Sequence, residues 1–107
     1  GAPAAGLDAE EQRALGAALG AALAGRFEVG RLLGAGGMGS VFLGRDVALH
    51  RPVALKVVAP ELARSSAVRE RFLREARTVA RLRHPGIVAV HAAGQDGGLL
   101  WFAMEFV

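Results

Sequence analysis

Residues 34–41 constrain the fold more than any other part of this chain, because they follow the pattern G-x-G-x-x-G-x-V. Glycines at this density let backbone N–H groups approach a phosphate closely and allow positive φ angles. An apolar run follows and ends at Gly44-Arg45-Asp46, so it is too short for a helix. The segment therefore predicts a β-hairpin whose turn contains the glycines.

This order of strand, glycines and strand separates the segment from two other phosphate-binding loops. A Rossmann dinucleotide loop requires a helix directly after the glycines, within a βαβ unit. A Walker A loop ends in Gly-Lys-Ser/Thr, and no such tripeptide follows here. The remaining alternative is a flexible glycine hairpin that binds no ligand.

Lys56 is the only lysine among the 13 Lys and Arg residues, and it lies inside the apolar run at residues 53–58. A charged group in such a strand needs a partner or a ligand, because burying it unpaired is very costly. Lysine is a compact point charge on a flexible stem, which suits a phosphate oxygen in a tight site. The alternative is that its side chain extends to solvent.

Residues 65–83 predict an amphipathic helix, because their apolar side chains recur at a helical period. Ser65 or Ser66 can cap its start, and His84-Pro85-Gly86 ends it. Most of its charged residues lie off the apolar stripe, which produces an arginine-rich face. Such a face can meet nucleic acid or an anionic lipid surface. Because aromatic residues are few and acidic residues are interspersed, we expect a solvated face and no nucleic-acid partner.

Glu75 is the charged residue of this helix that does not follow the pattern. It lies three residues after Phe72 and four before Val79, so it shares their apolar face. A carboxylate on that face needs a cation, and Lys56 is the obvious candidate. The alternative is that Glu75 lies at the edge of the stripe and pairs with Arg71 or with water.

Together these segments resemble the protein kinase family. The glycine segment, the Lys56 strand and a helix glutamate 19 residues later follow the order and spacing of that family. Residues 84–88 resemble the turn after its αC helix, and residues 104–107 resemble its gatekeeper and hinge. The glycine loop and the arginine-rich helix are most similar to the bacterial serine/threonine kinases. The resemblance covers about residues 26–107.

The fold that this resemblance implies is an incomplete domain, the N-terminal lobe of a protein kinase truncated at the hinge. It is an α+β fold with a five-stranded antiparallel sheet and one αC-type helix, in the order β-β-β-α-β-β. A hairpin turn is expected at residues 95–98. The strands are expected at residues 27–33, 41–43, 53–58, 87–90 and 99–107.

Residues 1–25 precede this lobe as a tail with a marginal Ala-rich helix. Asp8 and Glu11 fit a capping box, and leucines recur every four residues after them. Gly16 and Gly20 each weaken the helix by about 1 kcal/mol relative to Ala. A docking or self-association helix is the alternative.

The resemblance implies ATP as the ligand and two catalytic residues, Lys56 and Glu75. Lys56 would hold the α- and β-phosphates, and Glu75 would hold Lys56 through an ion pair. The glycine loop would cover the phosphates, apolar side chains would enclose the adenine, and the hinge backbone would hydrogen-bond its edge. Ordinary core packing is the alternative for the apolar members of this set. The expected nucleotide-binding residues are Leu33, Gly34, Ala35, Gly36, Gly37, Met38, Gly39, Val41, Ala54, Lys56, Met104, Glu105 and Val107.

The family's catalytic loop and D-F-G motif do not occur in this sequence, and the catalytic base and the Mg²⁺ ligands belong to those motifs. We therefore expect no metal ligands in this chain, Mg²⁺ only with the missing C-terminal lobe, and no activity from the fragment alone. The expected whole is a serine/threonine kinase acting on an unknown protein substrate. The alternative is a non-catalytic kinase-like interaction module. With no run of 18 apolar residues, no membrane segment is expected in this piece. Its expected location is the cytoplasm, where it stands alone or as part of a membrane-anchored protein.

Overall fold

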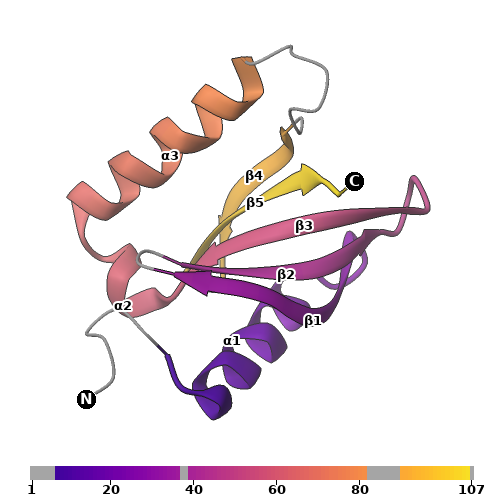
Figure 1. The fold of residues 1–107 in the computed structure, drawn as a ribbon, viewed down its shortest axis with the longest axis horizontal. Coiled ribbons are helices and arrows are strands. Elements are labelled where there is room, and N and C mark those ends of the chain that lie inside the picture. Colours follow the sequence, from indigo (N-terminus) through magenta and orange to yellow (C-terminus); the bar gives the residue numbers. More distant parts are fainter. Residues whose placement is uncertain (1–6, 37–38, 82–89, 107) are drawn as a thin grey trace.

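The computed structural model describes residues 7–36, 39–81 and 90–106. Over these ranges the chain forms a five-stranded antiparallel sheet with helices on both faces, which confirms the expected α+β fold (Figure 1). The spatial order of the strands is β1-β2-β3-β5-β4. The strands are β1 (Phe27–Gly36), β2 (Gly39–Asp46), β3 (Arg51–Val58), β4 (Val90–Asp96) and β5 (Leu99–Glu105). The helices are α1 (Ala9–Ala22), α2 (Pro60–Ala63) and α3 (Ser66–Arg81).

Helix α1 covers one face of the sheet. It begins with the expected capping box, in which Glu11 N–H donates to Asp8 Oδ1 at 2.8 Å and Asp8 N–H donates to Glu11 Oε1 at 3.1 Å. Three leucines, at positions 15, 19 and 23, are buried in a core that includes Phe27, Phe42 and Trp101. The helix that looks marginal by its glycines is therefore stabilised by tertiary packing, as most protein helices are.

Helix α3 covers the other face. Ser65 caps it, because its Oγ accepts a hydrogen bond from Val68 N–H at 3.3 Å. Phe72 and Ala76 are buried in a second core cluster with side chains of β3 and β5, among them Phe102. The helix was expected at residues 65–83; it spans Ser66–Arg81, and residues 82 and 83 lie outside the described ranges.

The prediction of the fourth strand at residues 87–90 is wrong in its extent. Strand β4 continues to Asp96, while residues 87–89 lie outside the described ranges. Its alanines and glycine have low intrinsic strand preference, so the sequence hides a strand that pairing with β5 produces. The expected turn is present, because Gly97 and Gly98 adopt φ values of 57° and 79° between paired strands.

Three further differences concern the lengths and number of the elements. β1 and β2 extend into the glycine segment, to Gly36 and from Gly39, because glycines pair in the ladder without side chains. β5 ends at Glu105. The short helix α2 was not expected, although Pro60 in its first turn is typical of a helix start. None of the helices in the described ranges is both long enough and apolar enough to span a bilayer.

Candidate functional site

Strand β3 carries the centre of the candidate site, because its side chains alternate between the two faces of the sheet. Val53, Leu55 and Val57 belong to the core beneath α1. Val58 belongs to the core beneath α3. Lys56, two residues before Val58, therefore lies on the α3 face of the sheet.

The packing of α3 determines where its glutamate lies. The Phe72 ring contacts the Phe102 ring of β5, with centroids 4.8 Å apart and planes inclined by 59°. Phe102 is the direct cross-strand neighbour of Lys56. Because Glu75 follows Phe72 by three residues, this aromatic contact holds Glu75 above Lys56.

Lys56 and Glu75 form an ion pair in which Lys56 Nζ donates to Glu75 Oε1. This is the pairing expected from the apolar positions of both residues. The Lys56 side chain is 20% exposed and that of Glu75 is 41% exposed, so the pair lies at the edge of the core and opens to solvent. An ammonium carries three N–H groups. Lys56 therefore keeps donors for an anionic ligand after Glu75 has accepted one of them.

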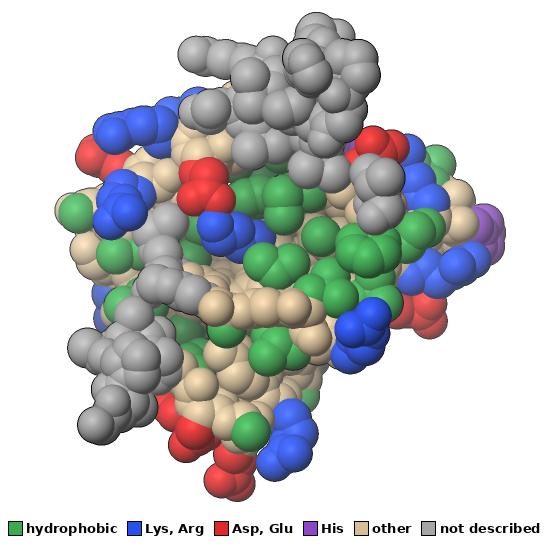
Figure 2. All heavy atoms as spheres, viewed as in Figure 1, with side chains coloured by type: hydrophobic (Ala, Val, Ile, Leu, Met, Phe, Trp, Pro, Cys, Tyr) green, Lys and Arg blue, Asp and Glu red, His purple; other side chains and the backbone are tan. Residues whose placement is uncertain are grey.

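An apolar strip adjoins this cation on the same face of the sheet. Val41 lies opposite Lys56 on β2, and Met104 lies opposite Ala54 on β5. Ala54 is buried, and Val41 and Met104 are half-buried. Figure 2 shows hydrophobic side chains gathered in the middle of this view, between α3 and the β1–β2 hairpin. A flat apolar strip ending at an ammonium suits a ring system with an anionic tail.

The glycine segment forms the hairpin that its pattern predicts, with Gly34 opposite Val41 and Gly36 opposite Gly39. Two of its glycines have different surroundings. A Cβ on Gly39 would stand 2.5 Å from the Val57 carbonyl oxygen, so this glycine lets β2 lie close against β3. A Cβ on Gly34 would meet nothing within 4 Å, so this part of the hairpin borders open space.

Other expected site residues lie around this centre. Leu33 is half-buried in β1, at an irregularity between its neighbours' pairings, and Ala35 is exposed. Glu105 is exposed at the end of β5. The expected residues outside the described ranges are Gly37, Met38 and Val107.

Two residues that contribute to this face were missed by the analysis of the sequence. Leu43 lies opposite Ala54 on β2, and Phe102 lies opposite Lys56 on β5. Both follow the two-residue period of a strand, since Leu43 comes two residues after Val41 and Phe102 two residues before Met104. That period was sufficient to find them.

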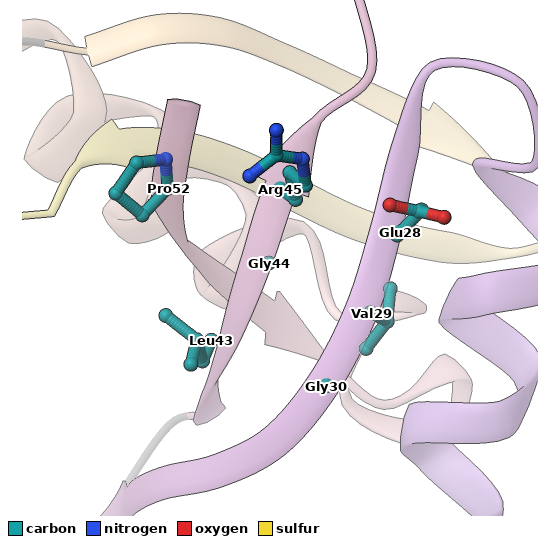
Figure 3. Close-up of a pocket in the computed structure, with 7 residues that line it drawn as sticks. All are labelled: Glu28, Val29, Gly30, Leu43, Gly44, Arg45 and Pro52. Atoms are coloured by element: carbon teal, nitrogen blue, oxygen red, sulfur yellow. The ribbon is translucent and has the colours of Figure 1, made fainter. Parts of the chain in front are cut away.

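A hollow of about 300 Å³ lies at the base of the hairpin (Figure 3). It does not contain the Lys56–Glu75 pair. Glu28 and Arg45, which are cross-strand neighbours, stand at its edge, as the close-up shows. Leu43 links it to the apolar strip, because Leu43 also lies opposite Ala54. Its lining residues are Glu28, Val29, Gly30, Leu43, Gly44, Arg45 and Pro52.

Comparison with known proteins identifies relatives of most of this chain. Residues 27–107 match the family model of the protein kinase domain. The serine/threonine-protein kinase PknJ of Mycobacterium tuberculosis is 56% identical over 81 residues, which are 76% of this chain and 14% of that protein. PknB of Mycolicibacterium smegmatis is 47% identical over 89 residues, which are 79% of this chain and 14% of that protein.

A solved structure is similar to this chain in fold as well as in sequence. The crystal structure of the Mycobacterium tuberculosis PknI kinase domain matches with a TM-score of 0.61 at 41% identity. The match covers 78% of this chain and 34% of the PknI chain. The chain thus spans about a third of a solved kinase domain and a smaller share of the curated relatives.

Proposed function

Because this chain belongs to the protein kinase domain family, we propose that it is the ATP-binding lobe of a serine/threonine protein kinase. The complete enzyme would transfer the γ-phosphoryl group of ATP to Ser or Thr hydroxyls of a protein substrate. The observation that carries this proposal is the Lys56–Glu75 ion pair, which lies beside an apolar strip and a glycine hairpin. Catalysis by this family depends mainly on positioning and charge stabilisation, and this lobe supplies the positioning.

Lys56 and Glu75 have distinct roles in this proposal. The Lys56 ammonium binds the α- and β-phosphate oxygens with the donors that Glu75 leaves available. Glu75 orients Lys56 and is itself carried by α3, so a shift of α3 would break the pair and misplace the ammonium. The position of α3 therefore couples to activity.

The residues present fit the rest of the nucleotide. The open space beside Gly34 leaves room for phosphates under the hairpin, whose backbone N–H groups would cover them. Val41 and Ala54, which share one face of the sheet, would contact one side of the adenine ring together with Leu33. The Glu105 carbonyl and the Val107 N–H would hydrogen-bond the adenine edge, and Met104 would close the back of the pocket.

The family's Mg²⁺ ligands belong to the catalytic loop and the D-F-G motif, which do not occur in this sequence. The described part of the chain gathers no group of three or more His, Asp or Glu side chains that would hold a metal ion. We assign Mg²⁺ binding and the catalytic base to a C-terminal lobe, which is thereby a required partner of this chain. Because ATP is supplied in the cytoplasm, we place the lobe there.

The test uses the product of the complete reading frame that contains residues 1–107. Lys56→Met should abolish ATP-dependent phosphorylation of a protein substrate while circular dichroism and the melting temperature stay close to those of the parent. Arg45→Met is the matched control, since Arg45 is an exposed cation on the neighbouring strand, and it should keep full turnover. Undiminished phosphorylation by Lys56→Met would refute the proposal.

A further inference from the structure

Helix α1 is part of the lobe's core although it precedes the residues that match the kinase family. The family model matches residues 27–107, whereas α1 spans Ala9–Ala22. Leu19 is fully buried against the sheet. In Figure 1 the helix runs beneath β1 and β2, on the side of the sheet opposite α3. It thus lies directly behind the strands that form the glycine hairpin.

A buried hydrogen bond joins α1 to the second strand of that hairpin. Ser40 Oγ donates to Gln12 Oε1 at 2.7 Å, across 28 residues of sequence. Gln12 is 7% exposed and Ser40 is 2% exposed, so water competes poorly for either group. Breaking this bond would leave buried polar groups without their partner, which proteins strongly avoid.

Ser40 occupies a sensitive position in the hairpin. It lies between Gly39, which lets β2 approach the Val57 carbonyl closely, and Val41, which lies opposite Lys56. Successive side chains of a strand point to opposite faces. Ser40 therefore bonds to α1 on one face of β2, while the other face of β2 borders the candidate nucleotide site.

β2 pairs with β3 from Ser40 to Asp46, whereas the other strand of the hairpin has fewer attachments. β1 is the edge strand of the sheet and pairs within it only with β2. Its pairing with β2 is irregular between Val29 and Leu32 and again between Leu32 and Gly34. Gly16 of α1 adds a second contact, since its missing Cβ makes room for the Phe42 ring of β2. Helix α1 thus holds β2 at two points, one polar and one apolar.

We propose that Gln12 is a positioning residue. It acts through Ser40 to hold the glycine hairpin at the distance from the nucleotide phosphates that binding requires. This inference rests on the proposed function of the lobe. Gln12 does not touch the nucleotide. Its loss leaves the hairpin free to lift from the phosphates, which weakens ATP binding while the protein-substrate site is unaffected.

Steady-state kinetics of the complete gene product test this role. Gln12→Met keeps the length and removes the amide, and Ser40→Ala removes the donor. Each should raise the KM for ATP about fivefold, equivalent to about 1 kcal/mol, and leave the KM for the protein substrate unchanged. The double variant should show no larger effect than the stronger single variant, because both changes remove the same bond.

Leu19→Val is the matched control on the same helix. It loosens the packing of α1 without touching the Gln12–Ser40 bond. We expect a lower melting temperature with an unchanged KM for ATP, since an unfolded fraction lowers the apparent kcat alone. If Leu19→Val raises this KM as much as Gln12→Met does, or if neither Gln12→Met nor Ser40→Ala raises it, the positioning role is wrong.

Amide hydrogen exchange provides a readout that does not depend on phosphoryl transfer. In the nucleotide-free protein, Gln12→Met should accelerate exchange in the hairpin strands β1 and β2 and leave β5 unchanged. Failure of the proposed function would appear as turnover that survives Lys56→Met. Failure of this inference would appear as hairpin exchange that Gln12→Met does not alter.

Discussion

The Phe72 ring of α3 lies 4.8 Å from the Phe102 ring of β5, and Phe102 lies directly opposite Lys56 on the neighbouring strand. The aromatic contact and the Lys56–Glu75 ion pair are thus two parts of one junction between helix and sheet. The pair is partly exposed to solvent, so it contributes little to stability. The buried aromatic contact holds α3 against the sheet, whereas the ion pair depends on the position of α3.

Phe72→Leu should lower the free energy of unfolding by about 1–2 kcal/mol, because it removes the ring contact with Phe102 and leaves space in the core. Urea denaturation monitored by circular dichroism measures this difference. Leu73→Ala is the matched control, since Leu73 is its neighbour and is 36% exposed. It should change stability by less than about 0.5 kcal/mol. Equal losses from both variants would contradict the assigned role of the ring.

Glu75→Gln should separate stability from activity. Because surface-exposed pairs contribute about 0–1 kcal/mol, the unfolding free energy should fall by less than about 1 kcal/mol. Turnover of the complete gene product should fall roughly 100-fold, since a misplacement of about 1 Å near the reacting groups has that effect.

Steady-state phosphorylation kinetics and chemical denaturation of the same preparation provide both numbers. Glu70→Gln removes an exposed carboxylate from the same helix and should leave turnover unchanged. A kcat for Glu75→Gln within twofold of the parent would count against the coupling of α3 to Lys56.

Gly39→Ala and Gly34→Ala should differ although both lie in the glycine hairpin. An added Cβ at Gly39 would stand 2.5 Å from the Val57 carbonyl oxygen, so β2 must shift, at a cost of about 1–3 kcal/mol. An added Cβ at Gly34 would meet open space, and stability should change by less than about 1 kcal/mol. Thermal unfolding of the two variants measures the contrast, and equal melting temperatures would show that β2 is not held closely against β3.

The two glycines within α1 should respond to alanine with opposite signs. Gly20→Ala should stabilise the protein by about 0.5–1 kcal/mol, because its nearest neighbour, Val29, would be at an ordinary 3.8 Å. Gly16→Ala should lose that gain and destabilise the protein, because its Cβ would stand 2.9 Å from the buried Phe42 ring. Chemical denaturation of the variants decides the matter. Equal stabilisation by both would mean that α1 does not pack on Phe42.

Much of the candidate site is predictable from local pattern. The glycine spacing indicates a hairpin. The apolar period of the later helix identifies Glu75 as an exception, and the apolar run at residues 53–58 identifies Lys56 as another. Each residue is conspicuous because a charge in an apolar position requires a partner. Two such exceptions of opposite sign predict each other, and the ion pair between them is present.

Gln12 obeys the same logic and was missed. It lies three residues before Leu15 and seven before Leu19, on the leucine face of α1, and Ser40 alternates with Val41 onto the same buried side as Phe42. A neutral amide and a hydroxyl are less costly to bury than charges, so their positions attract less notice. The fourth strand was misplaced for a related reason, since its alanines and glycine do not produce the alternation of apolar and polar residues that indicates a strand.

Local periodicity and charge depend only on the order of residues, and they were enough to predict the hairpin and the Lys56–Glu75 pair. The family was suggested by the resemblance of the motifs and their order to those of protein kinases. Only the tertiary structure shows that α1 packs behind the hairpin and that β4 extends to Asp96. It also shows that Gly34 and Gly39 have different surroundings. The physical reason is distance along the chain. Periodicity describes neighbours within a few residues, whereas a contact such as Gln12–Ser40 joins elements 28 residues apart and exists only once both have packed on the same sheet.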